Sequence, residues 1–553
     1  MSTTNNTLKK ALLWFRNDLR LHDNESLIKT LRLANSSNNN TSKVGVLPLY
    51  CFDPRHFGFS RIGKFRKANA NRTRFLTESV DNLRKNLMNE WGLKLMIQIG
   101  HPEEIIPHLC SQYEIEQVFA DKEVTSEETS IEQVLEKQIN VNYSYGFSMV
   151  HVEDLPFKIE NLPHVFTDFR RKVENPKLIV RPLLQLSPNE KKLISSRVVN
   201  LIQDENALGK TPDLKVLGYT DEEISEMMEN LKDPRSVLHF KGGEDEALAR
   251  LNDYLWTQDR LKTYKETRNG LVGEAYSSKL SPWLSLGCIS PRKIYHEVKR
   301  YEKERVENDS TYWLIFELLW RDYFRFFAEK FGNHIFMLKG VTRASSKRKG
   351  LIGDSSSNKV ESKYDETRWK QDLKLFKLWA DGKTGLPFVD ANMRELKISG
   401  WMSNRGRQNV ASFLSKDLNL DWRLGAEYFE SLLLDHSVTS NWGNWLYAAG
   451  VGDVDPRGEA RYFNVVKQGF DYDFNGEFVK LWIPELDQVP QRCIHAPYLM
   501  SESEQTNAKC TIGVDYPKSL VNVKAHHHLN ENGVKANYKH KTGKANERER
   551  KIR

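Results

Sequence analysis

Cysteine is scarce in this sequence of 553 residues, and the cysteines that are present do not form metal-binding or redox pairs. There are five of them, an odd number, and no two are spaced as C-x-x-C. Zinc sites and thiol redox centres usually show such pairs, and a disulfide framework needs an even set. The sequence therefore predicts free thiols in a reducing compartment and no metal site.

Long apolar runs are also missing. No stretch of about 18 apolar residues is present, so we expect no membrane span. The first ten residues, MSTTNNTLKK, contain no apolar signal core. We therefore expect an intracellular protein of the cytoplasm or nucleus, with an organelle as a further alternative.

Two common nucleotide-binding signatures are absent. No G-x-G-x-x-G follows the first apolar run, which removes the ordinary dinucleotide fingerprint. Gly382-Lys383-Thr384 lacks the glycine that a phosphate-binding P-loop carries five positions earlier. Neither signature can be the basis of a function here.

The positive charge is concentrated at one end of the sequence. The net charge is +8, and residues 524–553 hold nine Lys or Arg and three Glu, which leaves the remainder close to neutral. This segment could add nonspecific affinity for DNA or RNA phosphates. It could equally be a solvated, disordered end, which is the interpretation that its composition favours.

The first part of the chain predicts an α/β domain. With 553 residues and 39% hydrophobic content, the chain can bury two or more cores. In residues 8–150, short apolar runs alternate with helix-like stretches such as 72–90, a pattern typical of a parallel, doubly wound sheet. The predicted strands cover residues 11–15, 44–52, 94–99 and 117–120.

The rest of the chain divides into three parts. Residues 151–235 are rich in proline, asparagine and charge, as expected of a connector that wraps the surface. Residues 236–489 show helical periodicity, which predicts an all-α domain, and residues 490–553 predict a basic, disordered tail. Residues 341–364 predict a polar surface loop. The predicted helices cover 246–266, 291–301, 312–331, 366–381, 390–399, 405–418 and 426–434.

Six tryptophans lie between Trp369 and Trp445, close to Arg407, Asp435 and Asn441. Clustering alone favours an aromatic core, because tryptophan buries a large apolar area. The polar neighbours favour a cofactor pocket with a path for electrons. Asp435 ends an apolar helix face and needs a cation, for which Arg407 is the candidate.

Two further patterns support a ligand site. Glu317, Trp320, Arg321 and Phe324 share one helix face, and a polar ligand would justify a buried acid and base beside a flat aromatic surface. The alternative is an exposed ion pair beside an apolar stripe. The hydroxyl residues in 277–281 precede Pro282 and predict a helix N-cap, which could also bind an anion such as a diphosphate.

These patterns belong to a longer series of ordered motifs. The series comprises residues 14–20, 22–24, 264, 268–270, 277–281, 317–321, 382–387, 389–390, 400–407, 453–457 and 461–464. Over residues 12–486 the sequence resembles the photolyase/cryptochrome family, and most closely its cryptochrome DASH branch.

The resemblance implies an α/β antenna domain followed by an all-helical domain that holds a noncovalent FAD. Glu317 and Trp320 would line a cavity for a cyclobutane pyrimidine dimer, and Asn441 would stabilise reduced states of the flavin. The implied electron-transfer chain runs through Trp445, Trp422 and Trp369. The implied FAD-binding residues are Tyr264, Ser277, Ser278, Lys279, Leu280, Ser281, Arg321, Asn404, Arg407, Asp435, Ser437 and Asn441.

Within this family, two positions are DASH-like and bear on the choice of DNA. Gln408 stands where bacterial dimer photolyases tend to carry Met, and Tyr447 stands where they carry Trp. Both changes make the cavity more polar and reduce stacking, so we expect a preference for dimers in single-stranded DNA. The branch commonly carries a methenyltetrahydrofolate antenna, for which Glu123 is the candidate contact, although it could be an ordinary surface glutamate.

Three functions remain open at this point. The first is a light-driven DNA repair lyase, which we expect to act as a monomer. The second is a blue-light receptor that signals through flavin photoreduction. The third is a nucleic-acid-binding regulator that acts through the basic segment at 524–553.

Overall fold

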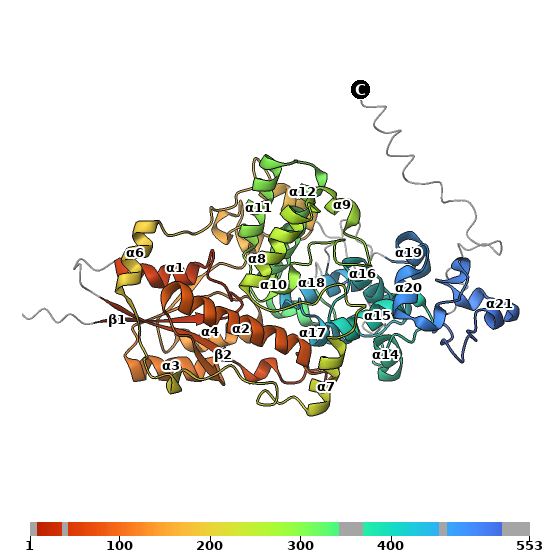
Figure 1. Ribbon diagram of the computed structural model, residues 1–553, viewed down its shortest axis with the longest axis horizontal. Coiled ribbons are helices and arrows are strands. Elements are labelled where there is room, and N and C mark those ends of the chain that lie inside the picture. The colour runs from red at the N-terminus through yellow and green to blue at the C-terminus, as the bar shows by residue number, and fades with distance from the viewer. Residues whose placement is uncertain (1–7, 36–42, 342–368, 453–461, 522–553) are drawn as a thin grey trace, which may run out of the picture.

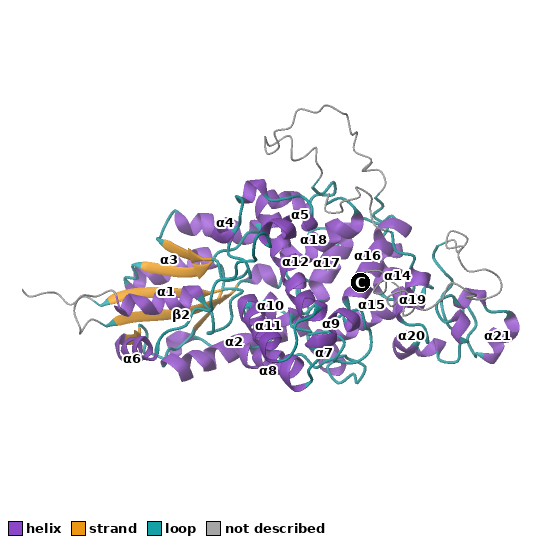
Figure 2. Ribbon diagram, turned by 90° about the horizontal axis from the view of Figure 1, so that it is seen from above, coloured by secondary structure: helices purple, strands orange, loops and turns teal. Residues whose placement is uncertain are grey.

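The computed structural model describes residues 8–35, 43–341, 369–452 and 462–521. A parallel sheet with its covering helices forms one end of the molecule, and the helical domain forms the other (Figure 1). The second view shows the same division, with strands confined to one end (Figure 2). The predicted fold class is therefore confirmed.

The sheet is parallel throughout, with the strand order β3-β2-β1-β4-β5 and with β6 added beside β2. All four predicted strands are present. Every residue of β2 is buried, as expected of a parallel strand that is covered on both faces. The strands are β1 Lys9–Phe15, β2 Val44–Phe52, β3 Met96–Ile99, β4 Gln117–Asp121, β5 Val141–Ser144 and β6 Val198–Asn200.

Each face of the sheet has its own core. Leu12 and Trp14 of β1 belong to a smaller cluster that includes Leu109 and Ile131 from two of the covering helices. Leu13 lies on the opposite face, in a large cluster that continues into the helical domain. The helices of this domain are α1 Glu25–Arg32, α2 Ala70–Trp91, α3 Pro102–Tyr113 and α4 Ser126–Glu136.

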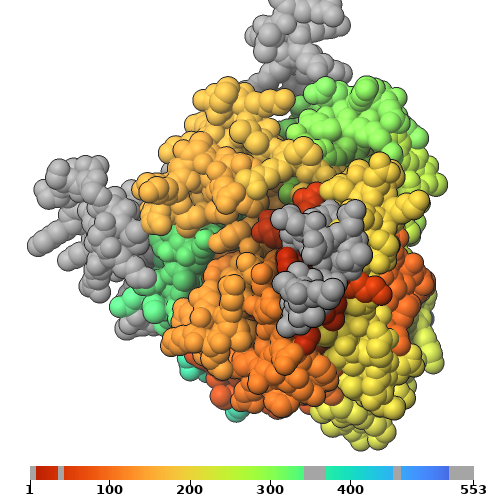
Figure 3. Space-filling view, turned by 90° about the vertical axis from the view of Figure 1, so that its left-hand side faces the viewer, coloured from red at the N-terminus to blue at the C-terminus, as the bar shows by residue number. Residues whose placement is uncertain are grey.

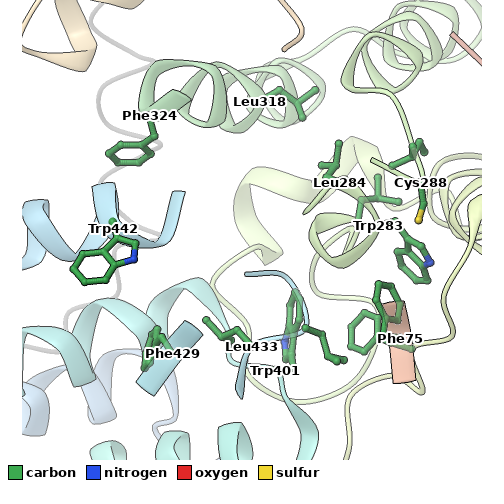
Figure 4. Packing of buried hydrophobic residues seen from close by; sticks show 14 of the residues in the cluster. Phe75, Trp283, Leu284, Cys288, Leu318, Phe324, Trp401, Phe429, Leu433 and Trp442 are labelled. Carbon is green, nitrogen blue, oxygen red and sulfur yellow. The ribbon is translucent and has the colours of Figure 1, made fainter. Parts of the chain in front are cut away.

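The large core joins the two domains. Phe75 of α2 packs against Trp283, and Phe240 packs against both Trp283 and Trp401, with ring centroids 5.3–6.1 Å apart. Figure 4 shows how Phe75, Trp283 and Trp401 come together from segments far apart in the sequence.

Residues 151–235 lie partly on the face of the molecule shown in Figure 3, where they are visible in yellow shades. This connector contains α5 Phe166–Val173, α6 Pro188–Arg197 and α7 Asp221–Asn230. It also contributes β6, which pairs with Val44–Val46 of β2. The α/β layer therefore draws a strand from beyond residue 150, where the first domain was expected to end.

The helical domain follows the predicted helices with two interruptions. The predicted helix 246–266 ends its α-helical part at Asn252, continues as a π-helical turn over Asp253–Thr257 and is broken by Asp259 at φ 54°. The predicted helix 405–418 also ends in a π-helical turn, over Phe413–Asp417. The helices are α8 Glu244–Asn252, α9 Tyr264–Thr267, α10 Ser281–Ser285, α11 Pro291–Glu304, α12 Asp309–Phe331, α14 Leu373–Ala380, α15 Pro387–Ser399, α16 Asn404–Ser412, α17 Trp422–Leu432 and α18 Val438–Ala449.

Residues 490–521 are folded, so the prediction of a disordered tail from 490 is wrong for this segment. Ile494 and Tyr516 are buried in a third core with Phe478. The Tyr516 hydroxyl donates to Asp390 at 2.5 Å, and the Leu520 N–H donates to the Thr384 carbonyl at 2.9 Å. This segment contains α21 Glu502–Asn507 and follows α19 Val465–Tyr472 and α20 Glu477–Trp482.

Several predicted segments lie outside the described residues. They are the basic segment 524–553, nearly all of the polar loop 341–364, and the motif at 453–457. Within the described ranges, none of the helices combines the length and the apolar character that a bilayer-spanning segment needs.

Candidate functional site

The centre of the site is an ion pair between α16 and the loop that precedes α18. The Arg407 guanidinium binds both carboxylate oxygens of Asp435, at 3.0 and 2.9 Å, and its Nε donates to the Met402 carbonyl at 2.8 Å. The Ser281 hydroxyl donates to Asp435 at 2.7 Å. Ser403 caps the first turn of α16, the helix that carries Arg407, by accepting the Gly406 N–H at 3.2 Å. The predicted pairing of Arg407 with Asp435 is confirmed.

The segment 277–281 is built differently from the prediction. Leu280, whose side chain cannot cap, precedes α10, so the expected hydroxyl N-cap is wrong. Instead, the Ser277 and Ser278 carbonyls accept hydrogen bonds from Arg250 at 3.3 and 3.0 Å. Arg250 of α8 thus anchors this loop. Ser281 comes directly after the loop, and its hydroxyl reaches Asp435.

The remaining predicted cofactor residues differ in burial. Asn441 lies on α18 and is buried, with its amide donating to the Ala426 carbonyl at 2.9 Å. Tyr264 begins α9 and is buried. Ser437 immediately precedes α18, and its hydroxyl lies 3.3 Å from that of Thr439. Asn404, the first residue of α16, is exposed.

Arg321 lies at the seam between the domains. Its guanidinium donates to the Leu284 carbonyl at 3.1 Å and to the Phe147 carbonyl, and it lies 3.7 Å from the centre of the Phe147 ring. Burial lowers the pKa of Arg321 to about 9. These contacts fasten α12 to the first domain, which is a structural role beside the predicted cofactor role.

The same helix, α12, carries the candidate substrate residues. Glu317 forms an ion pair with Arg268. Trp320 stacks on Phe166 with ring centroids 3.7 Å apart and meets the Tyr447 ring edge-on at 6.3 Å. Burial raises the pKa of Glu317, although Arg268 opposes the shift.

Gln408 is held near this group by a second arginine. Its amide oxygen accepts a hydrogen bond from Arg405 at 3.0 Å, and Arg405 also donates to Asn269 at 3.1 Å. The 268–270 motif therefore supplies partners to both Glu317 and Arg405.

Trp422 and Trp445 are buried on packed helices. Trp445 of α18 lies 6.3 Å from Trp379 and 5.1 Å from Phe429, between ring centroids. Trp422, on the neighbouring α17, lies 5.7 Å from Trp442. Trp369 is only half-buried. The arrangement brings Trp379 against Trp445, a contact that the sequence did not predict.

A cavity of about 160 Å³ lies between the two domains. Its lining includes Glu123 of the first domain and Arg325, His436 and Ser437 of the helical domain. The Glu123 carboxylate accepts hydrogen bonds from Asn17 at 2.8 Å and from Arg325 at 3.0 Å. Burial disfavours its charge, but Arg325 and Arg16 hold the pKa of Glu123 below its usual range.

The residues around the Arg407–Asp435 pair fit a flavin nucleotide. The pair is hydrogen-bonded and carries no net charge. The Trp401 ring, 5.4 Å from the Arg407 guanidinium, belongs to the large buried core together with Leu318, Leu433 and Trp442 (Figure 4). Glu395 of α15 is fully buried, and neither carboxylate oxygen has a hydrogen-bond partner in the described part of the chain. A buried polar atom of this kind is unusual unless a ligand meets it.

Four residues of this region were missed by the sequence reasoning as site residues. They are Arg250, Arg268, Trp379 and Glu395. Arg268 lies in the recognised motif 268–270, so its pairing with Glu317 is the one contact of the four that the sequence could have predicted. Arg250 and Trp379 act through contacts with residues far away in the sequence, which no local pattern records, and burial of Glu395 is likewise a result of the tertiary fold.

Comparison with known proteins agrees with this geometry. Residues 11–188 match the family model of DNA photolyase, and residues 313–536 match that of the FAD binding domain of DNA photolyase. The chain is 46% identical to the cryptochrome DASH of Synechocystis sp. over 95% of its own length and 98% of that relative's. It is 44% identical to the cryptochrome DASH of Xenopus laevis, with 92% and 88% covered.

Solved structures give the same result. The Synechocystis sp. cryptochrome superposes with a TM-score of 0.80 at 44% identity, covering 94% of this chain and 98% of that one. A class III photolyase from Agrobacterium tumefaciens superposes with a TM-score of 0.72 at 25% identity, covering 95% and 97%. This chain therefore belongs to the photolyase/cryptochrome family, within its cryptochrome DASH branch, and its helical domain is an FAD-binding domain.

Proposed function

We propose that this protein uses FAD and blue light to split cyclobutane pyrimidine dimers in DNA, with a preference for single strands. The observation that carries the proposal is the group on α12, where a partly buried glutamate held by Arg268 lies beside the Trp320 ring. An acid next to an aromatic surface suits a flipped pyrimidine pair, which needs both hydrogen bonds and stacking.

FAD would be held by the Arg407–Asp435 pair, the segment 277–281 and Asn441. When bound, it would supply the light-excited electron that splits the dimer and accept it back. The task of the protein is to position the two partners and to exclude water. Asn441 is oriented for this by its hydrogen bond to Ala426.

Glu317 would bind the bases. Because burial raises its pKa, its carboxyl holds a proton closer to neutral pH than an exposed glutamate does. In that form it can donate a hydrogen bond to a pyrimidine carbonyl. Arg268 fixes the orientation of the carboxyl group and limits the rise of its pKa.

The preference for single strands follows from limited stacking. One face of Trp320 is already covered by Phe166, and Tyr447 offers a smaller ring than tryptophan would. Flipping a dimer out of a duplex costs a few kcal/mol of unstacking, which a single strand largely avoids. A polar cavity with Gln408 recovers less of that cost.

The interdomain cavity would hold a second chromophore, for which methenyltetrahydrofolate is our candidate. Glu123 supports this proposal, since an ionised carboxylate on the wall of the cavity can accept hydrogen bonds from a pterin ring. Absorption and mass spectra of the chromophores released from purified protein test it. A folate-free protein with a normal FAD content would contradict it.

The test of the main proposal is repair by purified protein with reduced FAD under blue light. Thymine dimers are supplied in single-stranded and in duplex DNA, with dark controls and with a Glu317→Gln variant. We expect repair of the single strand, at least tenfold faster than that of the duplex. Equal repair of both would overturn the preference.

The second candidate function is a blue-light receptor. The buried contact between Trp445 and Trp379 favours it, because closely spaced indole rings provide a route for electrons toward the flavin. Photoreduction of FAD without repair of either DNA would support the receptor and overturn the lyase.

A further inference from the structure

A partly exposed aromatic stripe on α12 continues beyond the candidate substrate group. Trp313, Glu317 and Trp320 are spaced i, i+4, i+7, so they share one face of the helix. All three side chains are partly exposed, whereas Leu314 and Leu318 beside them are buried. The dimer is assigned to Glu317 and Trp320. Trp313, one turn nearer the start of α12, therefore lies just beyond the place that the dimer would occupy.

The aromatic surface is continuous from Trp320 to Trp313. Trp320 stacks on Phe166 with ring centroids 3.7 Å apart. Phe166 meets Phe316 edge-on at 5.3 Å, and Phe316 lies 4.8 Å from Trp313 with 33° between the ring planes. Because these neighbours hold the indole of Trp313 in one orientation, a ligand that contacts it does not have to order a free side chain first.

Two cations lie over the indole of Trp313. The Lys265 amino group of α9 is 5.1 Å from the ring centroid, and the Arg268 guanidinium is 5.7 Å from it. Arg268 is held by Glu317, whereas Lys265 pairs with Asp309 at 2.6 Å, and these last two side chains are 37% and 81% exposed. Contacts of an exposed lysine are weak, because water and salt screen them. Lys265 can therefore leave the ring at little cost.

A nucleotide is the partner that this surface fits. Its base offers a flat π-face to the indole, and its phosphate offers a negative charge to Lys265, so one nucleotide replaces both contacts of the lysine. A stacked base binds an indole more strongly than an exposed lysine does. Trp313 and Glu317 are four residues apart, about 6 Å along the helix axis, which is less than two base steps of about 3.4 Å. The nucleotide that adjoins a dimer bound at Glu317 can therefore reach the indole.

We propose that Trp313 is a stacking site for the base next to the dimer in single-stranded DNA, and that Lys265 moves from the indole to the phosphate of that nucleotide. The inference rests on the proposed placement of the dimer against Glu317 and Trp320. A flipped dimer leaves its neighbour with one free face, and stacking that face on Trp313 recovers part of the loss. In a duplex the same base stays paired with the opposite strand, so this site favours single strands.

The experiment measures the dissociation constant of the FAD-loaded protein for labelled single-stranded oligonucleotides with one thymine dimer, by fluorescence anisotropy in the dark. The base on the 5′ side or the 3′ side of the dimer is removed in turn, which leaves an abasic sugar. We expect the loss of one of these bases to weaken binding by the wild type about tenfold, and the loss of the other by less than about threefold. Trp313→Leu should bind the intact oligonucleotide about tenfold more weakly than the wild type, with no further loss when the same base is removed.

Two further variants and a probe sharpen the test. Trp313→Phe keeps an aromatic face, so removal of the base should still weaken its binding at least about threefold. Trp256→Leu is the matched control: Trp256 is also partly exposed, with Arg300 and Arg305 over its ring at 4.3 and 5.3 Å, but it belongs to the π-helical turn after α8. It should bind every oligonucleotide as the wild type does. A 2-aminopurine in place of the stacked base should lose fluorescence on binding the wild type and keep it on binding Trp313→Leu.

Each result decides one point. Wild-type protein that binds the intact and both abasic oligonucleotides equally well would overturn the inference while leaving the dimer site intact. An effect of base removal that survives at full size in Trp313→Leu would place the base on another surface and overturn the inference as well. Protein that binds a strand with a dimer no more tightly than an undamaged strand would overturn the proposed function itself, and the inference with it.

Discussion

The hydrogen bond between Tyr516 and Asp390 gives a direct test of how firmly residues 490–521 belong to the fold. Both residues are fully buried, and the hydroxyl donates to the carboxylate at 2.5 Å. Asp390 also accepts hydrogen bonds from the Thr384 N–H and hydroxyl and from the Gly385 N–H. Tyr516→Phe therefore removes one of four bonds and preserves the ring that packs in the third core.

The expected cost is about 2 kcal/mol, since a hydrogen bond to a charged group contributes roughly 1.5–3 kcal/mol. The cost acts on the local opening of the C-terminal segment, whose other tie to this loop is the Leu520 N–H bond to Thr384. An opening that becomes 2 kcal/mol easier is populated about 30-fold more. Proteolysis of a segment that opens and closes rapidly follows that population.

The assay is native-state proteolysis, with mass spectrometry of the peptides released from 490–521. We expect Tyr516→Phe to be cut about 30-fold faster than the wild type. Tyr462→Phe is the control, because it removes a similar bond, to Asp417 at 2.8 Å, from a tyrosine that is 50% exposed. It should change the rate by less than about threefold. An unchanged rate in Tyr516→Phe would refute the argument that this bond fastens the segment.

Three further predictions concern the site. Asp435→Asn keeps the shape of the side chain but leaves Arg407 without its bidentate partner. We therefore expect the variant to purify with less than about a tenth of the FAD that the wild type holds, measured by absorbance. A normal FAD content would contradict the role of the ion pair. Trp422→Phe should slow the photoreduction of FAD, followed by transient absorption, at least about tenfold, while repair with chemically reduced FAD keeps its rate. If only Trp379→Phe slowed photoreduction, the electron path would instead run through the contact between Trp379 and Trp445. Tyr447→Trp should raise duplex repair at least about threefold by adding a stacking surface, and an unchanged ratio of duplex to single-strand repair would show that stacking at this position does not limit base flipping.

The parts of the fold that were predictable are those that leave a local pattern. The strand at 44–52 is apolar at nearly every position because a parallel strand is covered on both faces. β6 was missed because three residues are too few to show a period. Residues 490–521 were missed because they fold as short turns around a few buried side chains, among them Ile494 and Tyr516.

The contacts of the candidate site were likewise predictable only where a local sequence pattern records them. The pairing of Arg407 with Asp435 was predictable, since a carboxylate at the end of an apolar helix face requires a cation. The capping role given to the serines at 277–281 was wrong because Arg250 binds their carbonyls from α8. A hydroxyl before proline is a good local signal for a cap, but it carries no information about an arginine that arrives from another helix.

A single helix, α12, links the three regions on which the proposed function depends. Glu317 and Trp320 lie in the candidate substrate group, while Arg321 binds the Phe147 carbonyl of the first domain. One turn further on, Arg325 holds Glu123 at the wall of the interdomain cavity. Because a helix fixes these positions relative to one another, a shift of α12 would change the substrate group and the interdomain cavity together. The carboxylate of Asp322 opposes such a shift by accepting the N–H groups of Met149 and Val150 at 3.0 and 2.8 Å. The domain interface is therefore part of the proposed site, since it sets the distance between the interdomain cavity and the candidate substrate group.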